Sequence, residues 1–212
     1  VDRVAERVDD ATEEAVAIQD WNTVHARFKS KGFAGSTSLR DAAGRLIVGP
    51  GPIYTAYNLW YEQPDRMWSI NYKVGTILPA GTPVQDVRIG KRNTVTFASM
   101  DGRRYTIYFQ AKFHGPLSIV DFAQRLFTTK DYGQLIAGFS DKEVQAIRDG
   151  VLREGMSKDA VLVAYGYPPE HQTPSLDREV WYFWSNRFTR KPIHFGADGR
   201  TTRPDTAMPD AL

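Results

Sequence analysis

The sequence predicts an α+β fold, and three observations support this class. Apolar residues recur every three or four positions near the N-terminus and again after Gly115, a period typical of amphipathic helices. Between Tyr54 and Phe113 the pattern changes to short runs rich in β-branched and aromatic residues, bounded by turn residues, which indicates strands. The composition, 42% hydrophobic and 12% aromatic over 212 residues, is sufficient for a folded core.

Residues 1–52 are expected to form an N-terminal helical segment followed by a linker. From Asp2 to about Lys31, apolar side chains repeat at helical spacing with mixed charges between them, which favours one or two amphipathic helices docked on the rest of the protein. Glycines then end the pattern, and a short strand is expected at Leu46–Val48.

Residues 53–115 are expected to form an antiparallel β unit. Several short strands close together in sequence imply a sheet folded on itself, as either a small barrel or a sandwich. Asp101-Gly102, between two of the runs, predicts a hairpin turn because both residues tolerate positive φ.

Residues 116–204 are expected to begin with helices. Ser118, with Asp121 three positions later, predicts one helix start, and Ser140 with Glu143 forms an S-x-x-E capping box that predicts a second. The second helix is expected to continue to residue 154, with Gly150 as a weak point.

A third, two-turn helix is expected over residues 158–165. Ser157 is its predicted N-cap, and Gly166 is expected to end it in a left-handed conformation before two prolines. The strand EVWYFWSN follows. It alternates Trp181 and Phe183 on one face with Tyr182 and Trp184 on the other, so one face can cover the helices. The stretch KPIHFGADGRTT predicts its partner strand.

The stretch IRDGVLREGMSKDAVLVAYGYP is followed by a Trp-Tyr strand and by a hydrophobic strand that ends in a DGR turn. With this pattern, residues 140–202 resemble the SmpA/OmlA family of small bacterial outer-membrane lipoprotein domains. The resemblance implies a β-lactamase-inhibitor-like fold, two helices against a small antiparallel sheet, and a non-catalytic role in the envelope. The chain departs from the family pattern because about 140 residues precede the unit and no cysteine is present for lipidation. The positions that match the family motif are Ile147, Gly150, Gly155, Met156, Ser157, Val161, Gly166, Pro168, Trp181 and Tyr182.

In the middle of the chain, an LPAGTPV turn lies between one predicted strand and several later ones. This stretch is similar to bacterial SH3-like barrels, which place such a turn between an early strand and the barrel strands. This resemblance implies binding of peptides or cell-wall components through an aromatic groove. Together with the outer face of the C-terminal sheet, it makes the candidate binding residues Tyr57, Trp60, Tyr61, Trp68, Tyr72, Tyr182 and Trp184.

The sequence contains no recognisable signature of an enzyme. The four histidines lack metal-ligand spacing, and no G-x-S-x-G elbow or phosphate-binding loop is present. We therefore expect no catalytic residue, no metal and no cofactor. The absence of cysteine excludes disulfides and thiolate chemistry within these residues, and a net charge of +2 with dispersed basic residues argues against nucleic-acid binding.

These observations predict a non-enzymatic cell-envelope protein with a scaffolding role, located in the periplasm or on the periplasmic face of the outer membrane. Its expected partner is an envelope protein or a peptidoglycan-type ligand. Membrane attachment is expected only through a lipid anchor upstream of Val1. Two alternatives remain: an enzyme or enzyme inhibitor whose active surface the sequence does not reveal, and a structural module in which every aromatic side chain is buried.

Overall fold

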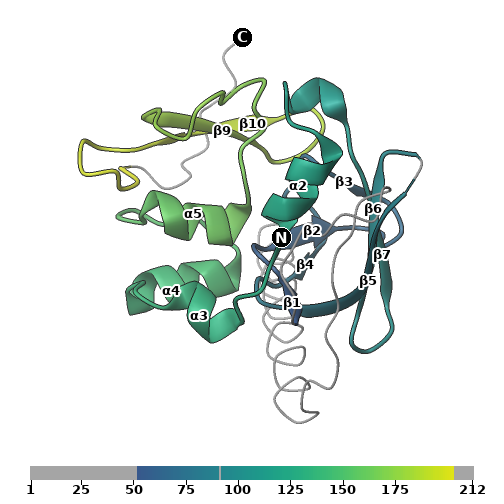
Figure 1. Ribbon diagram of the computed structural model, residues 1–212. Coiled ribbons are helices and arrows are strands. Elements are labelled where there is room, and N and C mark those ends of the chain that lie inside the picture. Colours follow the sequence, from purple (N-terminus) through teal and green to yellow (C-terminus); the bar gives the residue numbers. More distant parts are fainter. Residues whose placement is uncertain (1–51, 91, 203–212) are drawn as a thin grey trace, which may run out of the picture.

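The structure is a computed structural model that describes residues 52–90 and 92–202. Over these ranges the protein is mixed α+β, with four α-helices, one 3₁₀-helix and three sheets (Figure 1). The helices expected before residue 32 and the strand expected at Leu46–Val48 lie outside the described residues.

The largest sheet is curled and has six strands in the order β3-β7-β6-β5-β1-β8. All neighbouring strands are antiparallel except β3 and β7, which run parallel. The predicted turn at Asp101-Gly102 joins β6 to β7, with Gly102 at a φ of 89°. The strands are β1 (Ile53–Thr55), β3 (Met67–Trp68), β5 (Pro83–Gly90), β6 (Thr94–Ser99), β7 (Arg104–Tyr108) and β8 (Phe127–Thr128).

A second sheet pairs β2 (Leu59–Tyr61) with β4 (Thr76–Leu78). The sequence also favoured a strand over WSINYKVG, but only its first residue belongs to one, because the chain turns at residues 69–70 and Asn71 takes a φ of 57°. That prediction was wrong for the rest of the run.

The described residues contain two hydrophobic cores, and the first lies between the curled sheet and helix α2 (Ile119–Leu126). Ser118 and Asp121 form the predicted capping box, and Phe122, Ala123 and Leu126 are buried against the curled sheet. Because these three side chains lie on one face of the helix, the opposite face is left for solvent.

The second core is built from α4 (Asp141–Asp149), α5 (Lys158–Tyr165), β9 (Val180–Trp184) and β10 (Arg190–His194). The predicted alternation in β9 is confirmed: Trp181 and Phe183 are buried, whereas Tyr182 and Trp184 are half-buried. A short helix that the sequence did not predict, α3 (Tyr132–Ile136), precedes α4. In Figure 1, α3, α4 and α5 stack beside the curled sheet and the β9–β10 hairpin lies next to α5.

The starts of α4 and α5 agree with the prediction, and a single carboxylate connects them. Glu143 accepts hydrogen bonds from the backbone N–H groups of Ser140, at 2.9 Å, and Ser157, at 2.8 Å. Burial opposes ionisation, but these bonds outweigh it and lower the pKa of Glu143 to about 2.

Helix α4 is shorter than predicted. It ends at Asp149 because Gly150 takes a left-handed conformation, with φ 65° and ψ 30°. A Cβ atom at this position would lie 2.4 Å from the Ile77 side chain. Gly166 does end α5, but its φ of 81° is combined with an extended ψ of −172° rather than the left-handed geometry expected.

Three polar side chains join the two cores through backbone carbonyl groups, and we call Asn58, Asn71 and Lys73 the carbonyl network. The Asn58 amide donates to the Ile147 carbonyl at 2.7 Å, and Asn71 donates to the Tyr165 carbonyl at 3.1 Å. The Lys73 ammonium donates to the same Tyr165 oxygen at 2.6 Å. Each residue thus connects the sheet side of the molecule to α4 or α5.

Candidate functional site

Four side chains from distant parts of the chain meet beside α2, and we call them the side-chain network. The Oγ atom of Ser69 lies 2.8 Å from Nε2 of His114, and Nδ1 of His114 lies 3.0 Å from Oε2 of Glu170. The second carboxylate oxygen of Glu170 pairs with the guanidinium group of Arg125 on α2. The network therefore links a serine, a histidine, a carboxylate and an arginine in series.

Backbone bonds and ring stacking fix these positions. Ser69 follows β3, and its N–H donates to the Tyr108 carbonyl at the end of β7. His114 ends the 3₁₀-helix η1 (Ala111–Phe113), and its ring stacks on Phe109 with centroids 5.0 Å apart. Glu170 lies in the loop after α5. The next residue fixes this loop, because the His171 N–H donates a hydrogen bond to the Phe113 carbonyl.

The order of partners sets the direction of each hydrogen bond. A carboxylate can only accept, so we assign the Nδ1 proton of His114 to the bond with Glu170, which leaves Nε2 to accept from the Ser69 hydroxyl. Burial opposes ionisation of Glu170, but the bond from His114, a backbone hydrogen bond and the charge of Arg125 together outweigh it, and the pKa of Glu170 is lowered. This is the order of groups by which serine hydrolases activate a nucleophile.

The same geometry leaves little space at the serine. Ser69 is 7% exposed and His114 is 4% exposed, and the enclosed cavity beside them has a volume of about 10 Å³. That is space for about one water molecule. The N–H of Gln110 already donates to Ser69 Oγ at 3.0 Å, and the N–H of Ser69 is bonded to Tyr108, so neither group is available to stabilise an oxyanion. In this arrangement the network does not admit an acyl substrate.

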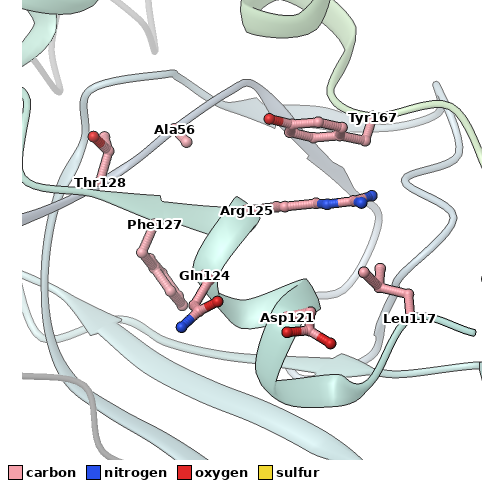
Figure 2. A pocket seen from close by; sticks show the side chains of 8 residues that line it. All are labelled: Ala56, Leu117, Asp121, Gln124, Arg125, Phe127, Thr128 and Tyr167. Atoms are coloured by element: carbon pink, nitrogen blue, oxygen red, sulfur yellow. The ribbon is translucent and has the colours of Figure 1, made fainter. Parts of the chain in front are cut away.

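An open pocket of about 500 Å³ lies on the other side of Arg125 and Tyr167, and we call it the α2 pocket (Figure 2). It shares Leu117, Arg125 and Tyr167 with the enclosed cavity, so the pocket wall is also the outer wall of the side-chain network. The lining residues are Ala56, Leu117, Asp121, Gln124, Arg125, Phe127, Thr128 and Tyr167.

The α2 pocket combines opposite charges with an aromatic ring. The guanidinium carbon of Arg125 lies 4.8 Å from the Tyr167 ring centroid, within cation–π range. One turn earlier on α2, Oδ2 of Asp121 accepts bonds from the N–H and hydroxyl of Ser118, which lower the pKa of Asp121. A ligand in this pocket would meet a fixed cation, a fixed anion and an apolar surface.

The seven aromatic residues proposed from the sequence are dispersed in the structure. Tyr57, Trp60 and Tyr61 are buried, and of these Tyr57 lines the enclosed cavity. Trp68 is 36% exposed beside Tyr108, which is 37% exposed, and their rings lie 5.7 Å apart. The other three, Tyr72, Tyr182 and Trp184, are half-buried, and none of the seven lines the α2 pocket.

The residues of the family motif serve the packing and the ends of α5 in the structure. Met156, Val161 and Trp181 are buried in the second core, and Ser157 caps α5. Gly155 and Gly166 have positive φ, and Pro168 is buried. The motif therefore describes how α5 packs on β9.

Sequence reasoning missed the side-chain network because its members carry no local pattern. Ser69 is 45 positions from His114, and His114 is 56 positions from Glu170. No motif connects them, and Ser69 lies in a run that the sequence favoured as a strand. A histidine outside any metal-ligand spacing was the one signal available, and it does not identify its partners.

The comparisons with known proteins returned nothing: no family model, no curated protein and no solved structure matches the chain. Within the described residues, no group of three histidine or acidic side chains could hold a metal ion. No helix in the same ranges is long and apolar enough to cross a membrane.

Proposed function

We propose that the protein is a non-enzymatic binding protein that holds a polar ligand in the α2 pocket. The observation that carries the proposal is the pocket itself, about 500 Å³ in volume and lined by charged, polar and aromatic side chains. This volume is within the range of ~300 to 1,000 Å³ typical of ligand sites. The adjacent serine and histidine are enclosed, which favours binding over catalysis.

We further propose that the ligand is of the peptidoglycan type and that the protein belongs to the cell envelope. The resemblance of residues 140–202 to SmpA/OmlA domains supports this location, and the packing of α4 and α5 with the β9–β10 hairpin in one core is compatible with that fold. The antiparallel run β5-β6-β7, with β1 beside β5, is compatible with an SH3-like unit.

The binding proposal is tested by NMR titration with soluble peptidoglycan fragments. We expect saturable shifts at residues 117–128 and at Tyr167, and weaker binding by the Gln124→Ala variant. Gln145→Ala is the matched control, because Gln145 is also an exposed helical glutamine but lies on α4. An absence of saturable shifts, or equal weakening by both variants, would contradict the proposal.

The envelope location has a separate test. The mass of the N-terminal peptide of the protein purified from its native cells, together with membrane fractionation, would reveal a diacylated cysteine upstream of Val1. An unmodified start and recovery from the cytoplasm would overturn the proposed location.

A second candidate function, a serine hydrolase, is favoured by one specific observation. The Ser69–His114–Glu170 distances of 2.8 and 3.0 Å are those of a proton relay. A fluorophosphonate probe distinguishes the two functions: labelling of the native protein that is lost in Ser69→Ala would establish a reactive serine and refute the non-enzymatic role. We expect no labelling, because the cavity at Ser69 holds about one water molecule.

A further inference from the structure

We infer that the α2 pocket selects a ligand that carries an ammonium group and a carboxylate close together, as in the zwitterionic form of an amino acid. The inference rests on the proposed function and specifies the ligand chemistry of the same pocket. It is carried by the placement of Asp121 and Arg125 on successive turns of α2, both on the pocket wall (Figure 2).

Asp121 is the acceptor for the ammonium group. Its side chain is exposed, and both bonds from Ser118 go to Oδ2. Among residues 52–90 and 92–202 no hydrogen-bond donor contacts Oδ1, and no ion pair with Arg125 forms, because the guanidinium group turns to Glu170 instead. An incoming ammonium group can therefore bind Asp121 without displacing a partner that lies within these two ranges.

Arg125 is the donor for the carboxylate. A guanidinium group has five N–H donors, and the contact with Glu170 is made through Nη1. Figure 2 shows the side chain extended below the Tyr167 ring, along the pocket wall. Glu170 and Tyr167 hold the group in place, so its remaining donors are already oriented for a ligand.

The charges argue against simpler ligands. The charged side chains that line the pocket are Asp121 and Arg125, one negative and one positive, so their charges balance at the wall. A simple anion would be repelled by Asp121, and a simple cation would be repelled by Arg125. Side chains four positions apart on a helix have Cβ atoms ~6 Å apart. This spacing suits an ammonium and a carboxylate attached to the same carbon atom.

Isothermal titration with three forms of one peptide tests the inference. The probe is a peptidoglycan stem tripeptide whose terminal diamino acid has a free ammonium and a free carboxylate on one carbon. The comparison forms carry either an N-acetyl group on that amine or an amide in place of that carboxylate. Because each change removes a charge-assisted hydrogen bond, each should weaken binding roughly tenfold.

Two variants assign the effects to residues. Asp121→Asn should lose the preference for the free amine, and Arg125→Lys should reduce the preference for the free carboxylate, because lysine cannot form the planar two-donor contact. Asp141→Asn is the matched control, since Asp141 is an exposed acid in the first turn of α4, away from the pocket.

The outcomes separate the inference from the function on which it rests. Equal affinity for all three peptides overturns the zwitterion inference and leaves the binding function intact. Binding of none of them overturns both. Discrimination that survives in Asp121→Asn and Arg125→Lys also overturns the inference, because the selective groups would then lie elsewhere.

Discussion

The two polar networks that connect the curled sheet to the C-terminal part of the protein differ in what they bind. In the carbonyl network, Asn58, Asn71 and Lys73 bond to backbone groups. In the side-chain network, Ser69, His114, Glu170 and Arg125 bond mainly to one another, and three of them titrate or carry charge. The second network borders the α2 pocket through Arg125.

This difference separates stability from function. A buried backbone carbonyl group needs a hydrogen-bond donor, and in this fold Asn58, Asn71 and Lys73 supply such donors. The carbonyl network therefore has a structural role. Charged and titratable side chains that bond to one another beside a pocket are less necessary for folding than donors to buried carbonyl groups. Such arrangements are typical of functional sites. We therefore expect substitutions in the first network to change stability most, and substitutions around the second to change ligand binding.

The largest effect is expected from Asn58→Leu. Asn58 is fully buried, and its amide bonds both the Ile147 carbonyl and, at 2.8 Å, the Ala80 N–H. Leucine has a similar volume but leaves the Ala80 N–H without its partner and removes one of the two donors to the Ile147 carbonyl, which keeps the bond from the Gly150 N–H. The free energy of unfolding should therefore fall by about 3 kcal/mol. Urea denaturation measures this change. A loss below about 1 kcal/mol would mean that the carbonyl network does not join the two cores.

Glu170→Gln should have the next largest effect and lower the free energy of unfolding by about 2 kcal/mol at pH 7. The folded pKa of Glu170 is lowered, so its contribution is complete above the unfolded pKa and disappears as the pH falls through the folded value. The stability difference between wild type and variant should therefore shrink from pH 7 to pH 3. A stability difference that stays constant with pH would show that the charge of Glu170 does not stabilise the folded protein.

Ser69→Ala should cost about 1 kcal/mol, since it removes the partner of His114 Nε2 and of the Gln110 N–H. Ligand binding in the α2 pocket should not change, because Ser69 does not line it. Thermal unfolding and titration with the same peptidoglycan fragments check both statements. A large loss of binding would place the ligand at the serine instead.

Lys73→Met is the exception within the carbonyl network and should have the smallest effect at neutral pH, because the cost of burying the ammonium group offsets its bonds to the Asn71 and Tyr165 carbonyls. Burial lowers the pKa of Lys73 well below its usual value, while its ammonium lies 4.3 Å from the Trp60 ring centroid. Between the folded and unfolded pKa values the unfolded chain binds more protons, so wild-type stability should rise with pH relative to the variant. Unfolding at pH 7 and 9.5 measures the difference between the two proteins. An equal pH dependence would mean that Lys73 keeps its usual pKa.

The helix starts were predictable because the signals are local. Ser118 with Asp121 and Ser140 with Glu143 lie within one turn, so their bonds do not depend on the rest of the fold. The alternation in β9 was predictable for the same reason. The length of α4 was not, because Gly150 ends the helix where Ile77, distant in sequence, leaves no space for a Cβ atom.

The candidate site could not be read from the sequence. The α2 pocket is formed by α2, β8, the segments next to β1 and before α2, and the loop after α5, and only the folded chain brings Asp121, Arg125 and Tyr167 together. Aromatic density in the strands indicated a binding surface, but Tyr57, Trp60 and Tyr61 are buried in the structure. Aromatic side chains in strands serve the core as readily as a surface, and the sequence does not distinguish the two uses.

The most direct test is an NMR titration of the whole chain with peptidoglycan fragments, followed at the side-chain amides of Asn58 and Asn71, the guanidinium of Arg125 and the ring of Tyr167. We predict saturable shifts at Arg125 and Tyr167 and unchanged amide signals at Asn58 and Asn71. Shifts confined to the exposed pair Trp68 and Tyr108, or no saturable shift at any residue, would contradict the assignment of the α2 pocket as the binding site.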